Sequence, residues 1–409
     1  MKTILVIADG LGGRPSDFDG KTCLQAADTP ALDHFAQAGI TGLMDSIKPG
    51  IIPGSDTAHL SIFGYDTEKR YTGRGVFEAA GIGMEVRPGD VCFRTNFATV
   101  DEENTVIDRR AGRIEEGQDQ LEEALQSLSS STYPDVEIRF QRSTEHRGAL
   151  LLRGSELGDN VTDTDPHETG VQIVESAPED SESKKTAEIL NEVMEHARKI
   201  LSEHPLNDRR KKQDKLPANA LLARGSARYP DIPSLESKYD LDSTVVAAGA
   251  LYIGVAKISG MEYKHAEGTD GTVNSKIINK ARLAVDELEA GKDLVFIHFK
   301  GADNASHDHD AAEKIKFIEK IDRTFGWLEE NCDWNETHLA FAGDHTTPIQ
   351  TGEHVADPVP VLIRGPNVRT DVVEQFDELA CTQGGLHRFS GQLLPTALSY
   401  SDFGKKYGA

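Results

Sequence analysis

The sequence predicts an α/β fold in which a parallel β-sheet is sandwiched by helices, with a smaller α+β domain inserted into it. Two observations support the sheet: short apolar runs rich in β-branched residues recur toward both ends of the chain, and helical patterns lie between them. A third supports the insertion, because the middle region has shorter strands and a more polar composition. The length of 409 residues suits two domains of ordinary size.

The expected strands of the sheet are continuous apolar segments rather than alternating ones. Continuous apolarity is typical of strands that are covered on both faces, as in a parallel sheet between helices. The clearest segments are 3–8, 294–299, 338–342 and 359–363, and 243–248 is a weaker one.

Helical patterns lie between these strands, at 29–37, 274–289 and 311–331. Thr29 followed by Pro30 is typical of a helix start, because proline is tolerated at the first helical position. In the last segment, apolar side chains recur every three or four residues, which indicates one buried helix face. They are Ile315, Ile318, Ile321, Phe325 and Leu328.

The middle region is interpreted as one domain inserted into another. Its expected strands and its single amphipathic helix lie at 91–100, 136–140, 149–152 and 183–202. The basic run 208–212 follows this helix; a solvated helix end or loop is the favoured interpretation, and an anion site is the alternative. The larger domain is therefore expected at 1–69 and 236–409, and the inserted domain at 70–235.

Charge and hydropathy exclude two classes of partner. The chain carries 68 acidic and 44 basic side chains, a formal charge of −24, whereas binding to a nucleic-acid backbone needs a basic surface. No apolar run is long enough to span a bilayer, and Asp9 interrupts the apolar start of the chain too early for a signal peptide. We therefore expect a cytoplasmic protein with no nucleic-acid or membrane partner.

The cysteines indicate the same compartment. Cys23, Cys92, Cys332 and Cys381 are isolated in the sequence and form no C-x-x-C pair. Neither a thiolate zinc site nor a disulfide framework is indicated, so four reduced thiols are expected.

Acidic and imidazole side chains follow three of the predicted strands. Asp9 ends the most N-terminal strand, and two strands in the last third of the chain are followed by Asp303, His307, Asp344 and His345. Because ligands bind beyond the carboxyl ends of the strands in an open parallel sheet, we expect these side chains to converge. Asp303 and His307 lie four residues apart and share one face if that turn is helical.

Two metal ions are expected at this edge of the sheet. Mixed carboxylate and imidazole ligands suit Mn²⁺, Zn²⁺ or Co²⁺ better than Ca²⁺. His354 is a further candidate, and five or six ligands are too many for one four-coordinate ion. His309 is the alternative to His307, and the spacing does not separate the two. For any single acid, a helix N-cap is the structural alternative.

A second signal is the run Pro-Gly-Ser-Asp-Thr-Ala-His at 53–59. Gly54 permits a tight turn that exposes the Ser55 hydroxyl, and a helix is expected behind it. A serine at a helix N-terminus is commonly a cap. Beside two divalent cations, however, a hydroxyl becomes a nucleophile at neutral pH, and the helix N-terminus favours a phosphate.

Seven motifs are spread over nearly the whole chain, at 7–10, 53–60, 108–113, 145–147, 163–167, 303–307 and 343–348. Together they resemble the archaeal type of 2,3-bisphosphoglycerate-independent phosphoglycerate mutase, a family of the alkaline phosphatase superfamily. The resemblance implies an alkaline-phosphatase-like fold and two divalent metals, Mn²⁺ first, with Mg²⁺, Co²⁺ or Zn²⁺ as alternatives, and no need for 2,3-bisphosphoglycerate. The implied ligand sets are Asp303, His307 and His354, and Asp9, Asp344 and His345, with Ser55 as nucleophile and further ligand.

The implied reaction is the interconversion of 3-phosphoglycerate and 2-phosphoglycerate in glycolysis and gluconeogenesis. Ser55 takes the phosphoryl group, and the trapped glycerate recovers it on its other hydroxyl. Segments 1–69 and 236–409 would bind the metals, and 70–235 would bind the substrate and close to exclude water. The alternatives are a phosphomonoesterase or sugar-phosphate mutase of the same superfamily and, from another class, a non-catalytic binder of metal or phosphate ligands.

Two basic clusters suit a phosphorylated three-carbon acid, because arginine's fork grips phosphate and carboxylate at two points. For each arginine, pairing with a neighbouring surface acid is the alternative. Arg224 and Lys257 are weaker candidates, while Asp163, Asp165 and His167 would bind the glycerate hydroxyls or orient the arginines. The clusters are Arg109, Arg110 and Arg113, and Arg139, Arg142, His146 and Arg147.

Overall fold

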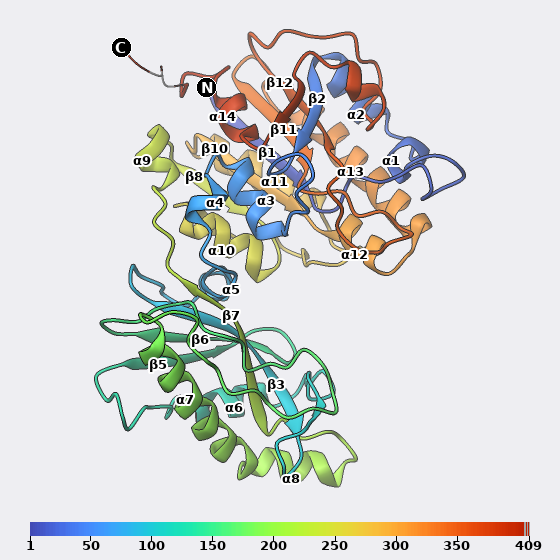
Figure 1. Ribbon diagram of the computed structural model, residues 1–409. Coiled ribbons are helices and arrows are strands. Elements are labelled where there is room, and N and C mark those ends of the chain that lie inside the picture. Colours follow the sequence, from blue (N-terminus) through green and yellow to red (C-terminus); the bar gives the residue numbers. More distant parts are fainter. Residues whose placement is uncertain (405, 407, 409) are drawn as a thin grey trace. The chain divides into compact units, whose positions relative to one another are not determined.

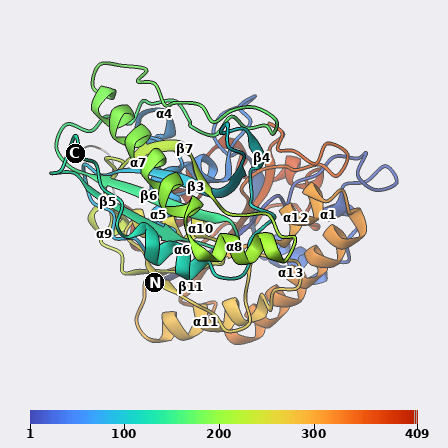
Figure 2. The same ribbon diagram turned by 90° about the horizontal axis from the view of Figure 1, so that it is seen from below.

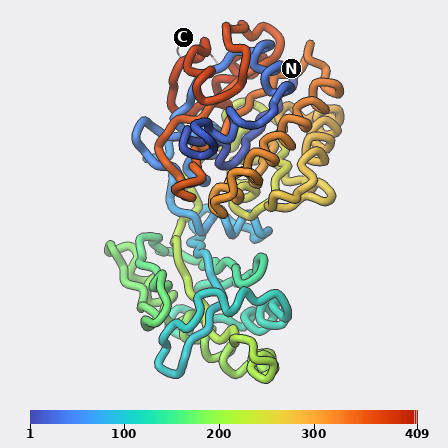
Figure 3. The backbone as a smooth tube through the Cα atoms, turned by 90° about the vertical axis from the view of Figure 1, so that its right-hand side faces the viewer, coloured from blue at the N-terminus to red at the C-terminus, as the bar shows by residue number. Residues whose placement is uncertain are grey.

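The computed structural model describes residues 1–404, 406 and 408 and divides the chain into two compact units (Figure 1). Unit 1 comprises Met1–Arg70 and Ile232–Ala409, and unit 2 comprises Tyr71–Asp231. The chain therefore passes between the units twice, near residues 70 and 231, and both passages can be followed in Figure 3. The functions expected of the two domains stay predictions.

Unit 1 contains an eight-stranded sheet in the order β13-β2-β12-β11-β1-β10-β8-β9. The central strands β11, β1, β10 and β8 are parallel to one another, so the predicted α/β class with a parallel sheet is confirmed. The strands are β1 Lys2–Ala8, β2 Gly39–Asp45, β8 Ser243–Val246, β9 Glu262–Lys264, β10 Leu294–Phe299, β11 Thr337–Gly343, β12 Val359–Arg364 and β13 His387–Ser390.

Strand β12 departs from the parallel arrangement that its continuous apolar sequence predicts. It is antiparallel to both of its neighbours, β11 and β2. The reason lies in the connection from β11, because residues 344–358 return His354 close to His345, at the same edge of the sheet where β11 ends. A strand that starts from that edge runs back across the sheet. Burial on both faces thus indicated a covered strand but not its direction.

Helices cover both faces of this sheet. One face is packed by α1 Cys23–Ala26, α2 Pro30–Gln37, α11 Ile278–Glu289 and α13 Ala311–Asn331, whose apolar residues join those of β1, β10 and β11 in one core. Phe296 and His298 alternate with core residues of β10 and therefore face the opposite side. There, His298 contacts His59 of α3 Ser55–Ile62 and Tyr252 of α10 Ala250–Ile258.

The long helix α13 has the predicted bounds, and its apolar stripe packs into the core, with Ile315 only partly buried. Helix α11 begins at Ile278, four residues later than predicted. The preceding residues are held in turns, since Asp270 accepts a hydrogen bond from the Thr272 amide and donates its own amide to Ser275. The remaining helices of unit 1 are α4 Thr67–Arg70, α9 Leu235–Tyr239, α12 Gly301–His307, the 3-10 helix η1 Ala380–Gln383 and α14 Leu393–Leu398.

Unit 2 is built on a five-stranded antiparallel sheet in the order β4-β3-β6-β5, with β7 also paired to β3. Its core lies between this sheet and helices α6 and α7, both of which are labelled in Figure 2. The elements are α5 Gly75–Gly81, β3 Val91–Val100, β4 Val106–Asp108, α6 Gln118–Leu125, β5 Glu137–Arg142, β6 Arg147–Arg153, α7 Lys184–Ser202, α8 Pro205–Lys212 and β7 Ala220–Arg228.

The basic run 208–212 forms the last part of helix α8. Arg210 is buried, and its guanidinium donates to the carbonyl oxygens of Leu216 and Ala111. This arginine therefore anchors α8 to two loops, while its neighbours form the solvated helix end that the sequence favoured. Among all the helices that the structure describes, none has the length and apolarity needed to cross a membrane.

Candidate active site

The register of the central strands brings three strand ends together. Ala8, the last residue of β1, lies opposite Phe299 of β10 on one side and Gly343 of β11 on the other. Asp9 and Asp344 directly follow two of these residues, and Asp303 lies in the first turn of α12, which begins just beyond the third. All three carboxylates are buried, with at most 2% of each residue exposed. The predicted convergence of these acids is therefore present in the fold.

Gly10 permits the close approach of these loops. Its backbone is left-handed, with φ of +66°, and a Cβ atom at this position would lie 2.7 Å from the Cα of Asp303. Its amide donates to Oδ1 of Asp344 at 3.0 Å. A larger residue would push the loop after β1 away from α12, so this position requires glycine.

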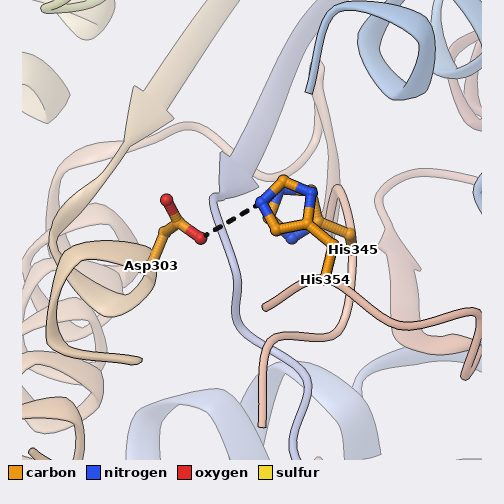
Figure 4. Close-up of side chains that lie close together, drawn as sticks. All are labelled: Asp303, His345 and His354. Atoms are coloured by element: carbon orange, nitrogen blue, oxygen red, sulfur yellow. Dashed lines mark ion pairs between the residues drawn. The ribbon is translucent and has the colours of Figure 1, made fainter. Parts of the chain in front are cut away.

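Two groups of possible metal ligands lie at this edge and share His345. The ligand atoms within each group lie within 4.8 Å of one another; the groups are Asp303, His345 and His354, and Asp9, Asp344 and His345. Figure 4 shows Asp303 pointing toward the stacked rings of His345 and His354. Oδ1 of Asp303 is 3.7 Å from Nε2 of His354, and the two rings lie 3.5 Å apart.

His307 and His309 occupy different environments. Nε2 of His307 is 3.3 Å from Oδ2 of Asp303, so the i,i+4 pair expected on one helix face is present. The ring of His309 instead contacts the carbonyl oxygen of Ile349 through Nδ1 at 2.6 Å. Of the two alternatives left open by the spacing, His307 is the one next to Asp303.

The chemistry of this cluster fits divalent cations. Oδ1 of Asp9 and Oδ2 of Asp344 are buried and have no hydrogen-bond partner within the described part of the chain. Burial and the neighbouring Asp9 raise the pKa of Asp344 to about 8, which reflects the cost of two close buried carboxylates. Burial opposes ionisation of Asp9 as well, but the charge of Lys300 holds its pKa well below the usual range. Cations bound to these oxygens would give them partners and would lower the cost of holding two buried carboxylates close together.

Two residues that the sequence reasoning missed also contact Asp9. Lys300 places Nζ 3.1 Å from Oδ2 of Asp9 and 2.8 Å from Oδ2 of Asp303, and thus joins the two ligand groups. The Tyr252 hydroxyl donates to Oδ2 of Asp9 at 2.5 Å, and its ring stacks on His298. Lys300 directly follows a predicted strand, which is a usable signal. Tyr252 lies within an apolar helix and carries no such signal.

Ser55 is not a helix cap. It is the first residue of α3, and Gly54 occupies the N-cap position, where the Thr57 side chain exchanges hydrogen bonds with the Gly54 backbone. The Ser55 hydroxyl is therefore available to other groups, and its Oγ lies 3.3 Å from Nε2 of His345. The structure places this hydroxyl at the shared residue of the two ligand groups.

In unit 2, basic residues from both predicted clusters gather around His146. This imidazole is 3% exposed. Burial is the main cause that lowers its pKa to about 4, and four guanidinium groups add to the shift: those of Arg147, Arg110, Arg113 and Arg224. The neutral imidazole and these four arginines form the cationic group of unit 2.

Asp165 binds Arg109, which belongs to the first predicted basic cluster. Both of its oxygens accept hydrogen bonds from Arg109, at 2.8 and 2.7 Å, and the His167 amide donates to it. Asp163 contacts Nε2 of His167 at 2.9 Å and accepts from the Gly225 amide. Hydrogen bonds of this kind are those expected of acids that orient the arginines; that role stays a prediction.

Several candidates pair with neighbouring acids or lie elsewhere: Arg139 pairs with Glu137, and Arg147 lies 3.4 Å from Glu145. Arg142 pairs with Asp119 at 2.5 Å and lies near Glu122, which is the surface pairing left open for each arginine. Lys257 lies on the exposed side of α10, the helix that carries Tyr252. Their substrate contacts stay predictions.

Comparisons with known proteins find relatives that match the whole chain. The family model described as 2,3-bisphosphoglycerate-independent phosphoglycerate mutase matches residues 36–207. Proteins of that name from Methanobrevibacter smithii and Archaeoglobus fulgidus are 43% and 45% identical, with 100% of both chains covered in each case.

Two solved structures resemble the chain over almost its full length. A protein from Pyrococcus horikoshii has a TM-score of 0.86 at 37% identity and covers 100% of this chain and 99% of its own. The cofactor-independent phosphoglycerate mutase from Thermoplasma acidophilum has a TM-score of 0.72 at 34% identity, covering 98% and 100%.

Proposed function

Because the chain belongs to the family of 2,3-bisphosphoglycerate-independent phosphoglycerate mutases, we propose that it interconverts 3-phosphoglycerate and 2-phosphoglycerate through a phosphoserine at Ser55. The observation that carries this proposal is the Ser55 hydroxyl, which is not used for capping and lies 3.3 Å from the histidine shared by both ligand groups.

Two divalent cations belong to the proposed site. Asp9, Asp344 and His345 would hold one, and Asp303, His307 and His354 the other, with the Ser55 hydroxyl as a further ligand. We propose Mn²⁺, because mixed carboxylate and imidazole ligands suit it. Such ions lower the pKa of a hydroxyl and neutralise charge on a phosphoryl group. The unpartnered oxygens of Asp9 and Asp344 support this assignment.

The reaction comprises two transfers at phosphorus. In the first, Oγ of Ser55 loses its proton and attacks the phosphorus atom, and the bond from phosphorus to the glycerate oxygen breaks as that oxygen takes up a proton. In the second, the other glycerate hydroxyl loses its proton and attacks the phosphorus of phosphoserine, and the bond from phosphorus to Oγ breaks as Oγ takes up a proton and becomes the Ser55 hydroxyl again. The amides at the start of α3 favour the negative charge near Ser55.

The cationic group of unit 2 would bind the substrate. Arg110, Arg113, Arg147 and Arg224 with His146 offer forked donors for carboxylate and phosphate oxygens. Asp165 and Asp163 would orient this group through Arg109 and His167. Arg142 and Lys257 are secondary candidates. We further propose a cytoplasmic location, which the four free cysteines support.

A coupled assay of phosphoglycerate isomerisation tests the proposal. Activity is expected without added 2,3-bisphosphoglycerate, is expected to disappear when the protein is stripped with a chelator, and is expected to return with Mn²⁺. Inorganic phosphate is measured in the same reaction. Release of phosphate at the rate of turnover would identify a phosphomonoesterase instead, and full activity in chelator would contradict the metal sites.

A further inference from the structure

The Thr347 hydroxyl lies between the two ligand groups. Thr347 is fully buried, and its Oγ1 is 2.9 Å from Nδ1 of His345 and 3.3 Å from Oδ1 of Asp303. A hydroxyl has one hydrogen to donate, and a carboxylate only accepts. The hydrogen therefore goes to Asp303, and the Thr347 oxygen accepts the Nδ1–H of His345.

This pair of hydrogen bonds determines which nitrogen of His345 is left for a cation. With the hydrogen on Nδ1, the lone pair is on Nε2, the atom that faces the site. Nε2 lies 3.2 Å from Oδ1 of Asp9, 3.3 Å from Oδ2 of Asp344 and 3.3 Å from the Ser55 hydroxyl. A histidine that binds metal through one nitrogen usually donates its other N–H to such an acceptor.

The backbone of Thr347 is held independently of its hydroxyl. Its amide donates to the carbonyl oxygen of Gly12 at 3.2 Å. Nζ of Lys314, a fully buried residue of α13, donates to the carbonyl oxygens of Gly12 and Thr347 at 2.9 and 3.0 Å. Removal of the hydroxyl alone would leave these contacts in place, so its contribution can be measured separately.

We infer that Thr347 is a positioning residue, whose hydroxyl orients His345 for metal binding and links it to Asp303 of the other ligand group. This inference rests on the proposed function only for the presence of the cations. It concerns how tightly they are held, not which phosphate ester reacts.

The test uses the full chain, stripped of metal and titrated with Mn²⁺ alone by calorimetry. Thr347→Val removes the hydroxyl and keeps the shape of the side chain, and Thr347→Ser restores the hydroxyl. Thr346→Val is a matched control, because the neighbouring Thr346 is equally buried and its Oγ1 has no hydrogen-bond partner among the residues described. Thermal unfolding of each metal-free variant checks that the fold is retained.

Thr347→Val is expected to weaken Mn²⁺ binding about 10- to 100-fold. Thr347→Ser is expected to stay within a few-fold of the parent, and Thr346→Val to equal it. Parent-like affinity in Thr347→Val, or an equal loss in Thr346→Val, would overturn the inference while leaving the proposed function intact. If the parent itself binds no Mn²⁺, both fail; if it binds Mn²⁺ without isomerising phosphoglycerate, only the proposed function fails.

Discussion

The Ser55 hydroxyl lies 3.3 Å from Nε2 of His345, although 290 residues separate the two in the sequence. His345 belongs to both groups of possible metal ligands, and Ser55 begins the helix behind them. The nucleophile and the cations are therefore expected to act on the same phosphoryl group.

Ser55→Ala is expected to reduce isomerisation to background, because no other hydroxyl at the start of α3 contacts His345 in the residues described. Metal content should stay nearly unchanged, since carboxylates and imidazoles supply most of the ligands. The measurements are the coupled assay and metal analysis after dialysis. Ser61→Ala, on the same helix, is the control, and substantial activity in Ser55→Ala would remove Ser55 from the reaction.

Lys300→Met is expected to destabilise the metal-free protein. Asp9 and Asp303 would lose the ammonium group that lies within 3.1 Å of both, and an unpaired buried charge costs about 3–5 kcal/mol, less here because the lysine side chain is 25% exposed. The melting temperature in chelator should fall, and saturating Mn²⁺ should recover most of the loss because the cations replace the missing charge.

Scanning calorimetry with and without Mn²⁺ measures this effect. Lys316→Met is the control, because that lysine is exposed and pairs only loosely with Glu313. Identical melting temperatures for Lys300→Met and the parent in chelator would show that Lys300 does not balance the acids.

His146 is expected to make the stability of unit 2 depend on pH. Burial lowers its pKa from an ordinary 6.5 to about 4, so the unfolded chain binds its proton more readily. The contribution to stability is complete above pH 6.5 and is lost as the pH falls toward 4, by at most about 3 kcal/mol. His146→Gln should lack this part of the pH dependence.

Urea unfolding of parent and variant at pH 7 and pH 5, followed by a probe in unit 2, measures the difference. The free energy of unfolding should fall more between pH 7 and pH 5 in the parent than in the variant. A gap that is constant between these pH values would mean that His146 titrates normally in the folded chain.

Asp165→Asn is expected to raise the KM for 3-phosphoglycerate about 10-fold and to leave Mn²⁺ affinity unchanged. The variant loses one of the charged oxygens that orient Arg109, and a charged hydrogen bond contributes about 1.5–3 kcal/mol. Asp90→Asn is a matched control, because Asp90 is equally buried and binds Arg153 in the same two-point manner. An equal rise in KM for both variants would indicate a general loss of structure.

The sequence by itself determined the α/β class and the residues at the strand ends. Parallel strands that are buried on both faces leave a recognisable apolar run, and the residue after each run must lie at one edge of the sheet. Asp9, Asp303, Asp344 and His345 were predicted on this basis, and the i,i+4 rule added His307.

Only the tertiary structure decided which side chains meet within that edge. It shows that β12 runs antiparallel to β11, that His345 belongs to both ligand groups, and that the Ser55 hydroxyl contacts His345 rather than capping its helix. It also brought in Tyr252, Lys300 and Thr347. These contacts join residues far apart in the chain, and local periodicity contains no information about distances across a sheet or between a helix and a loop.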